Sequence, residues 1–362
     1  MSGDKPIVIM AGGTGGHVFP ALAVAEDLRQ RGEAVVWFGT RAGIEARVVP
    51  AAGIPIEWLS VTGLRGKGLV TLLLAPFRLL RACWQALRIL QRNQPKAVLG
   101  MGGFVAGPGG LMAWLLNIPM YLHEQNSIAG LTNRILSRFA TRSYFAFPDV
   151  ASSMPQGECI GNPLRADFEG MEDPAKALAA RRDEPLQLLV IGGSLGAAAL
   201  NRLMPEAIAC LDVDNRPKIQ HQCGEKHAEA CGENYRAAKV EAEVVTFIED
   251  MRAAYVWADL VVCRAGALTV AEITAVGRAA LFIPFPYAVD NHQYHNARHL
   301  EQAGAAQIML EADISAENLA LKLQFFQQNR DALIDMAQKA RGLHQADAAS
   351  RLASDILQGV AA

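Results

Sequence analysis

Residues 12–17 (GGTGGH) place four glycines, a threonine and a histidine between an apolar run and a helical pattern. The run Lys5–Ala11 predicts a buried strand, and the spacing of apolar residues over His17–Gln30 predicts a helix. The glycines therefore follow the carboxyl end of a strand and open a helix, where backbone N–H groups converge and the helix dipole adds partial positive charge. This loop predicts an anion site with a histidine at its edge.

Two common anion-binding loops do not match this spacing. No lysine follows the glycines as a P-loop requires. Val18 stands where the dinucleotide fingerprint GxGxxG needs its third glycine, which disfavours a dehydrogenase.

Two further glycine-rich segments also follow predicted strands. They are residues 100–110 (GMGGFVAGPGG) and 188–201 (LLVIGGSLGAAALN). A single loop of this kind is commonly a tight turn or a place of close helix–sheet packing. Three of them in one chain favour phosphate binding.

Glu272 is a lone carboxylate near the start of an otherwise apolar helix, after a loop at residues 264–266. Burial of this charge would be costly unless a ligand binds it. Two ribose hydroxyls could do so, as they do with the acidic residue of dinucleotide folds. The alternative is a glutamate on the helix surface.

Strand-like runs alternate with helical patterns along the whole chain. Besides Lys5–Ala11, the predicted strands are Ala34–Phe38, Ile54–Leu59, Ala97–Gly100, Ile118–Leu122, Arg142–Phe147, Leu186–Gly192, Lys218–Gln222, Glu243–Phe247, Leu260–Cys263, Ala280–Ile283 and Ala306–Met309. The alternation predicts an α/β protein with two Rossmann-like domains, whose parallel sheets bind ligands in a cleft at the carboxyl ends of the strands. We expect the domains to span residues 1–162 and 163–362, with the last helix able to pack back on the first domain.

The net charge of −2 hides an asymmetry between the two halves. Residues 1–160 hold 15 basic and 9 acidic side chains, whereas residues 161–362 hold 19 and 27, so the halves are expected to meet different partners. The six cysteines form no CxxC pair and the polar start resembles no signal peptide, which indicates reduced thiols in a cytosolic protein.

Seven motifs, in order along nearly the whole chain, carry a resemblance to a known family. They are GGTGGHVFPALAVA (12–25), GMGGFVAGPGG (100–110), HEQNSIAGLTNR (123–134), GNPLR (161–165), GGSLGA (192–197), RAGALTVAE (264–272) and DNHQYHN (290–296). The chain resembles the MurG family of peripheral-membrane glycosyltransferases of bacterial cell-wall synthesis. The resemblance implies a GT-B fold and an inverting transfer of N-acetylglucosamine from UDP-GlcNAc to the 4-hydroxyl of the muramyl sugar on lipid I, which forms lipid II.

The resemblance also implies roles for the matching residues. The donor UDP-GlcNAc is expected mainly on the second domain, where the backbone of Ile248 reads the uracil edge, Glu272 holds the ribose hydroxyls and Ser194 meets the phosphates. The remaining donor contacts are expected at Thr14, Gly15, Gly16, Asn126, Arg165, Ala267, Leu268, Thr269, Val270, Ala271, Gln293 and Asn296, and the acceptor diphosphate at Gly13, Gly102 and Gly103. His292 stands where some relatives carry glutamine, and its contact with the sugar stays open.

His17 is the predicted catalytic residue. The acceptor hydroxyl loses a proton as it attacks the anomeric carbon, and a base of near-neutral pKa suits that step. The dipole at the start of a helix favours the neutral imidazole. A histidine that only positions the loop is the alternative, and Asp290 and Glu124 are weaker candidates for the base.

We expect no required cofactor. Many sugar transferases hold a metal ion with Asp-x-Asp, but the triplet Asp212–Asp214 lies in a predicted polar turn. Loop amides, helix dipoles and Arg165 could stabilise the departing diphosphate instead, so a divalent metal is expected at most to stimulate.

Residues 64–92 combine basic and apolar side chains, and no acidic residue occurs between Glu57 and Glu124. From Pro76 onward the segment predicts a helix with an arginine stripe, aromatic residues beside it and an opposite face that meets the core. The stripe holds Arg78, Arg81, Arg88 and Arg92, the flanking rings are Phe77 and Trp84, and the core face holds Leu79, Leu80, Cys83, Leu87 and Leu90. This pattern predicts peripheral binding to the anionic cytoplasmic face of the inner membrane, and an ordinary helix covering the sheet is the alternative.

Two other functions stay open at this point. A UDP-GlcNAc 2-epimerase has a related two-domain fold and the same nucleotide sugar, but it would not explain the basic, apolar segment. A non-catalytic nucleotide-binding module would need only one nucleotide loop. We expect no nucleic-acid partner, and association with other cell-wall enzymes is an expectation from the resemblance alone.

Overall fold

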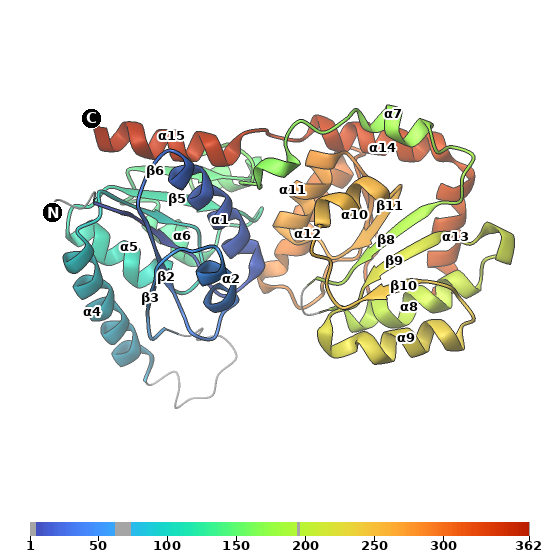
Figure 1. Ribbon diagram of the computed structural model, residues 1–362, viewed down its shortest axis with the longest axis horizontal. Coiled ribbons are helices and arrows are strands. Elements are labelled where there is room, and N and C mark those ends of the chain that lie inside the picture. The colour runs from blue at the N-terminus through green and yellow to red at the C-terminus, as the bar shows by residue number, and fades with distance from the viewer. Residues whose placement is uncertain (1–4, 62–73, 194–195, 362) are drawn as a thin grey trace. The chain divides into compact units, whose positions relative to one another are not determined.

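The computed structural model describes residues 5–61, 74–193 and 196–361 and divides into two compact units. Unit 1 holds Met1–Ala166 together with Asp347–Ala362, and unit 2 holds Asp167–Ala346 (Figure 1). The chain therefore passes from one unit to the other twice, and its last helix, α15 (Ala348–Ala361), belongs to unit 1.

Seven parallel strands form the sheet of unit 1, in the order β3-β2-β1-β4-β5-β6-β7. They are β1 (Ile7–Met10), β2 (Val35–Gly39), β3 (Ile56–Trp58), β4 (Ala97–Gly100), β5 (Met120–Glu124), β6 (Arg142–Phe145) and β7 (Gly157–Cys159). The strand order reverses at β1, which pairs with β2 on one side and β4 on the other. In open sheets of this kind ligands bind outside the strand ends at such a reversal.

Alternate residues of β1 face opposite helical layers of unit 1. Ile7 and Ile9 pack in a core with α1 (Gly15–Gln30), α2 (Glu45–Ala51) and α15. Val8 and Met10 pack in a second core with α4 (Ala75–Asn93), α5 (Ala106–Leu115) and α6 (Leu131–Leu136). Figure 1 shows α15 lying beside α1, the helix that carries His17.

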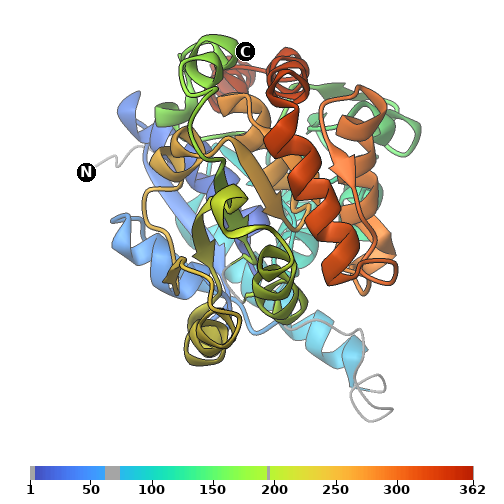
Figure 2. The same ribbon diagram turned by 90° about the vertical axis from the view of Figure 1, so that its right-hand side faces the viewer.

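Six parallel strands form the sheet of unit 2, in the order β10-β9-β8-β11-β12-β13. They are β8 (Gln187–Ile191), β9 (Lys218–Gln222), β10 (Glu243–Val245), β11 (Leu260–Cys263), β12 (Ala279–Phe282) and β13 (Gln307–Ile308). The helices are α7 (Pro174–Ala179), α8 (Ala198–Ala209), α9 (Ala228–Ala237), α10 (Met251–Trp257), α11 (Ala267–Val276), α12 (His292–Gln302), α13 (Ala316–Gln328) and α14 (Arg330–Gly342). Helices α8 and α13 share one core with the strands, and the side of the unit that carries α13 faces the viewer in Figure 2.

All twelve strands predicted from the sequence are present, and the two Rossmann-like units are confirmed. Strand β7 was missed, because its three residues include a glycine and a glutamate and form no apolar run. Part of the second glycine-rich segment is helical, since α5 begins at Ala106 and so contains Gly109 and Gly110. A Cβ atom at Gly109 would lie 2.3 Å from Met10 Sδ, so this glycine serves close helix–sheet packing.

The helix predicted from Pro76 is α4, but its predicted core face is wrong at two positions. Leu79 and Leu80 are 50% and 66% exposed. Apart from Ala75, the buried residues of α4 begin at Ala82, so its first turns do not cover the sheet. Residues 64–73 of the basic segment lie outside the described part of the chain. Among the helices that are described, none is both long and apolar enough to cross a membrane.

Candidate active site

The first glycine-rich loop joins β1 to α1. Thr14 is the N-cap residue with extended backbone, and its carbonyl accepts hydrogen bonds from the N–H groups of His17 and Val18 at 3.1 and 3.2 Å. The N–H groups of Gly15 and Gly16 belong to the first turn, where a helix offers them no preceding carbonyl. They are suited to receive an anion.

The second glycine-rich loop packs directly against the first. A Cβ atom at Gly103 would lie only 2.3 Å from the carbonyl oxygen of Gly12, and the φ angle of Gly103 is +80°. Both the space and the backbone conformation therefore require glycine at this position. The structure thus brings the two predicted loops of unit 1 together at the ends of β1 and β4.

The ring of His17 lies between Thr14 and Gly102. Its Nδ1 is 3.3 Å from Thr14 Oγ1, and a Cβ atom at Gly102 would lie 2.8 Å from its Cδ2 and 3.0 Å from its Nε2. His17 is half-buried, whereas Gly102 beneath it is buried. An anion at the second loop would therefore meet Gly103 rather than Gly102.

Glu45 is a buried carboxylate that holds the first loop in place. Its Oε2 accepts a hydrogen bond from the N–H of Gly13 at 2.9 Å. Its Oε1 accepts from the N–H and the hydroxyl of Thr40 at 2.9 and 2.7 Å. The N–H of Gly13 is thus used by Glu45, and the predicted contact of Gly13 with a diphosphate loses that donor.

Glu124, at the end of β5, holds the loop that carries Asn126. The carboxylate accepts hydrogen bonds from the N–H groups of Asn126 and Gly130, both at 3.0 Å, and from Asn133 Nδ2 at 2.9 Å. With only 3% of its surface exposed, Glu124 is a poor candidate for the base. Asn126 itself is half-buried, and its predicted contact with the donor sugar stays a prediction.

A hydrogen-bond chain behind the second loop ends at Gln125. His123 is fully buried, and burial lowers its pKa to about 4, so the ring is neutral near pH 7. Its Nε2 lies 2.9 Å from the carbonyl oxygen of Gly161, which can only accept, and its Nδ1 therefore accepts from Gln125 Nε2 at 3.1 Å. Gln125 Oε1 lies 3.6 Å from the Cβ position of Gly102, beside the ring of His17.

In unit 2, Gln222 joins two parts of the predicted nucleotide site. Its carbonyl accepts from the N–H of Gly192 at 3.2 Å, and its side-chain Oε1 accepts from the N–H of Ile248 at 3.3 Å. A contact of Ile248 with a base edge would therefore fall to its carbonyl. Ser194 lies outside the described residues.

Helix α11 presents the carboxylate of Glu272. The side chains of Ala267 and Val270 are buried, so these two residues could line a nucleotide site only with their backbone. Leu268, Thr269, Ala271 and Glu272 are half-buried. The hydroxyl of Tyr255 donates to Glu272 Oε2 at 3.0 Å.

Asn296, in the segment 290–296, is fully buried, and its Nδ2 donates to the carbonyl of Ala265 at 3.1 Å, so this amide nitrogen supports the loop before α11. Its predicted contact with the donor sugar stays a prediction. Gln293 is half-buried, and its Oε1 accepts from the N–H of Phe285 at 2.9 Å. His292 Nδ1 lies 2.7 Å from the carbonyl oxygen of Val289.

The remaining predicted residues lie on the surface of their own units. Arg165 is exposed near the end of the first stretch of unit 1, and Asp290 is exposed in unit 2 with a φ angle of +51°. Asp212 and Asp214 are exposed in a short turn around Val213–Asn215, as the sequence predicted. Within the described ranges no three His, Cys, Asp or Glu side chains are grouped as they would be around a metal ion.

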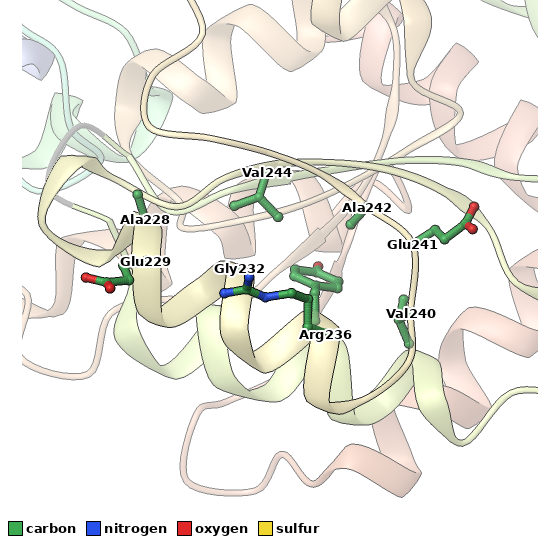
Figure 3. Close-up of a pocket in the computed structure, with 9 residues that line it drawn as sticks. Ala228, Glu229, Gly232, Arg236, Val240, Glu241, Ala242 and Val244 are labelled. Carbon is green, nitrogen blue, oxygen red and sulfur yellow. The ribbon is translucent and has the colours of Figure 1, made fainter.

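An open groove in unit 2 lies apart from these residues. It runs between α9 and the segment that leads into β10, and Figure 3 shows Glu229, Arg236 and Glu241 among its lining side chains. None of the residues predicted to bind the donor lines it. The nucleotide site predicted at the loop 192–197, Ile248 and α11 stays a prediction.

The two parallel-sheet units together match the fold of solved glycosyltransferase structures. A solved structure of the calicheamicin glycosyltransferase CalG4 matches with a TM-score of 0.70 over 99% of this chain and 98% of its own, at 14% identity, and so shares the fold. Two parallel-sheet units of this kind form the GT-B fold of glycosyltransferases.

The chain belongs to glycosyltransferase family 28. The N-terminal domain of that family matches residues 7–145, and its C-terminal domain matches residues 187–352. A crystal structure of MurG from Acinetobacter baumannii is 41% identical, covers 98% of this chain and 99% of its own, and has a TM-score of 0.84.

Curated relatives agree over almost the full length. Proteins of Alkalilimnicola ehrlichii and Nitrosococcus oceani are 54% and 53% identical over 355 and 352 residues, which are 98% and 97% of this chain and 98% of each relative. Both carry the name UDP-N-acetylglucosamine--N-acetylmuramyl-(pentapeptide) pyrophosphoryl-undecaprenol N-acetylglucosamine transferase.

Replacing Glu45 by glutamine should lower the free energy of unfolding by about 1–3 kcal/mol, because the amide nitrogen cannot accept and leaves the N–H of Gly13 or Thr40 unsatisfied. Urea denaturation measures this change. The matched control is Glu26→Gln, an exposed position on α1, where a change within about 0.5 kcal/mol is expected. Equal stability of Glu45→Gln and the wild type would show that the loop does not need both carboxylate oxygens.

Proposed function

We propose that this chain transfers N-acetylglucosamine from UDP-GlcNAc to the 4-hydroxyl of the muramyl sugar of lipid I, with inversion at the anomeric carbon. The observation that carries the proposal is the identity of 54% with a relative of that named activity, over 98% of both chains. The loop that places His17 and the helix that presents Glu272 supply groups suited to an acceptor and to a nucleotide donor.

In the proposed mechanism, His17 of unit 1 is the general base that removes the proton of the acceptor hydroxyl. This role requires the tautomer in which Nδ1 carries the proton and donates to Thr14 Oγ1, 3.3 Å away, so that Nε2 is the basic nitrogen. The acceptor hydroxyl attacks the anomeric carbon, its proton passes to Nε2, and UDP leaves with the electron pair of the glycosidic bond. A base in this position typically contributes about 10²–10⁴-fold.

Backbone groups stabilise the charge that the reaction creates. The glycine-rich loop before α8 offers N–H groups at a helix start for the departing diphosphate, and the first turn of α1 offers them for the acceptor diphosphate. Arg165 adds positive charge near the donor in this proposal. Since these groups carry the stabilisation, no divalent ion is required.

Incubation with labelled UDP-GlcNAc and a short-chain lipid I analogue tests the reaction. We expect a labelled disaccharide lipid as product, and we expect its formation to continue in EDTA, with at most mild stimulation by magnesium or manganese. Release of UDP without the disaccharide would point to epimerase-like chemistry. Loss of all transfer in EDTA, restored by magnesium, would contradict the metal-independent mechanism.

His17→Ala should lower turnover by about 10²–10⁴-fold, because the acceptor hydroxyl loses its base. The affinity for UDP-GlcNAc, measured by calorimetry, should change little, since the donor is held mainly by unit 2. Steady-state rates at saturating acceptor provide the test. Turnover close to that of the wild type would rule out both the base and the positioning role of His17.

A membrane surface is the proposed location of the lipid-linked acceptor. Helix α4 packs on α5 and α5 packs on α6, and all three expose large apolar side chains. These are Phe77, Leu79, Leu80 and Trp84 on α4, Leu111, Trp114 and Leu115 on α5, and Leu131 and Ile135 on α6. Contiguous exposed apolar surface of this kind favours contact with a lipid or protein surface.

Exposed arginines border this apolar surface, and their positive charges favour binding to an anionic bilayer. Arg78, Arg81 and Arg88 are exposed on α4, and Arg88 stacks on the ring of Trp84 at 5.5 Å. Arg92 pairs with Glu57 instead, and so contributes less to the basic stripe than its sequence position suggested. We propose peripheral binding to the cytoplasmic face of the inner membrane, with about 1 kcal/mol from each basic residue near the surface.

Charge reversal on α4 should reduce binding to anionic vesicles in a sedimentation assay. The test variant carries Arg78→Glu, Arg81→Glu and Arg88→Glu, and the matched control carries Lys218→Glu, Arg236→Glu and Arg252→Glu on the surface of unit 2. Binding of the wild type should fall with added salt, because surface charges are screened. Equal binding of both variants, or equal binding of the wild type to neutral vesicles, would contradict an electrostatic membrane contact.

A further inference from the structure

The buried side chain of Tyr255 is hydrogen-bonded to the carboxylate of Glu272. Tyr255 lies on α10, which packs on α11, and its side chain is fully buried. Its hydroxyl donates to Glu272 Oε2 at 3.0 Å. Burial, and then the nearby charge of Glu272, raise the pKa of Tyr255 well above its usual value, so the hydroxyl keeps its proton and stays a donor.

Tyr255 is itself fixed on two sides. Its ring meets the ring of Phe168 edge to face, with centroids 6.3 Å apart. Its backbone carbonyl accepts from Nε of the buried Arg278 at 2.9 Å, and the carbonyl of Val256 accepts from Nη2 of the same side chain at 3.0 Å. The hydroxyl of Tyr255 therefore has a fixed position, and the side chain of Glu272 is the one that adjusts to make the hydrogen bond.

A carboxylate can accept about four hydrogen bonds and donates none. A fixed donor that is hydrogen-bonded to a carboxylate holds the plane of the carboxylate in one orientation. Without that donor, the carboxylate rotates about the last bond of its side chain. Two vicinal hydroxyls of a ribose can both donate to one carboxylate only when its plane suits them. Orientation before binding lowers the entropy that binding costs.

We propose that Tyr255 is a positioning residue for donor selection: its hydroxyl orients Glu272 toward both ribose hydroxyls, and so sets the preference for a ribonucleotide over a 2′-deoxyribonucleotide donor. The proposal rests on the proposed role of Glu272 in holding the ribose. Tyr255 does not touch the nucleotide in this scheme, and acts only through the carboxylate.

Tyr255→Phe removes the hydroxyl and keeps the ring against Phe168. We would measure kcat and KM with UDP-GlcNAc and with its 2′-deoxyuridine analogue. The wild type should prefer the ribonucleotide donor by about tenfold to a hundredfold in kcat/KM, as expected for one hydrogen bond to a charged group. In Tyr255→Phe the KM for UDP-GlcNAc should rise several-fold at nearly constant kcat, and the preference should fall to about threefold or less.

Tyr235→Phe is the matched control. Tyr235 is another buried tyrosine of unit 2, on α9, and its hydroxyl pairs with His221 Nδ1 at 2.9 Å. This variant should keep the full ribonucleotide preference even if its melting temperature falls. A second comparison introduces Tyr255→Phe in the Glu272→Gln background, where it should no longer change the preference.

The outcomes distinguish the ribose role of Glu272 from the positioning role of Tyr255. A wild type without ribonucleotide preference would overturn the ribose role of Glu272 and the present proposal with it. A wild type that prefers the ribonucleotide, together with a Tyr255→Phe variant that weakens both donors equally, would leave Glu272 at the ribose and overturn the positioning role of Tyr255.

Discussion

The backbone contact between Gly12 and Gly103 is the constraint on which the site of unit 1 depends. A Cβ atom at Gly103 would lie 2.3 Å from the carbonyl oxygen of Gly12, so the loops after β1 and β4 approach too closely to admit a side chain there. His17 lies in the first turn of α1, which follows the first loop, and its ring rests on Gly102 of the second loop. The position of the ring therefore follows from two glycines, and these glycines shape the site as much as they offer N–H groups to an anion.

Carboxylates fix the loops around this contact, and they also limit where an anion can bind. Glu45 accepts N–H groups from the loops after β1 and β2, and Glu124 accepts N–H groups from the loop after β5. A carboxylate can do this because it accepts in several directions and donates in none. The charge of Glu45 beside Gly13 opposes a second negative charge at that point. An anion at the first loop would therefore be more favourable toward Gly15 and Gly16, where the start of α1 supplies positive potential.

The sequence predicts the strands well because each central strand is a short apolar run between loops, and it predicts the glycine-rich loops because glycine marks their backbone. It could not predict the partners of those loops. Glu45 lies 32 residues from Gly13, and Tyr255 lies 17 residues from Glu272. Neither stands in a recognisable motif, and only the packing of α2 and α10 brings them into contact. The prediction that Leu79 and Leu80 face the core is wrong for a related reason. Helical periodicity identifies one face of a helix, but it does not show where the neighbouring element that would cover this face ends.

His123, on β5, shows how a buried group can orient a side chain near the first glycine-rich loops of unit 1. Because the carbonyl of Gly161 can only accept, His123 must carry its proton on Nε2, and its Nδ1 must accept from the amide of Gln125. The amide nitrogen of Gln125 is thereby used by His123, and the amide oxygen lies 3.6 Å from the Cβ position of Gly102. Burial keeps His123 neutral down to about pH 4, so this orientation does not change over the range in which an imidazole base works. The Gln125 oxygen and the ring of His17 both lie close to Gly102, so this glycine is enclosed by residues of α1 and of the loop after β5.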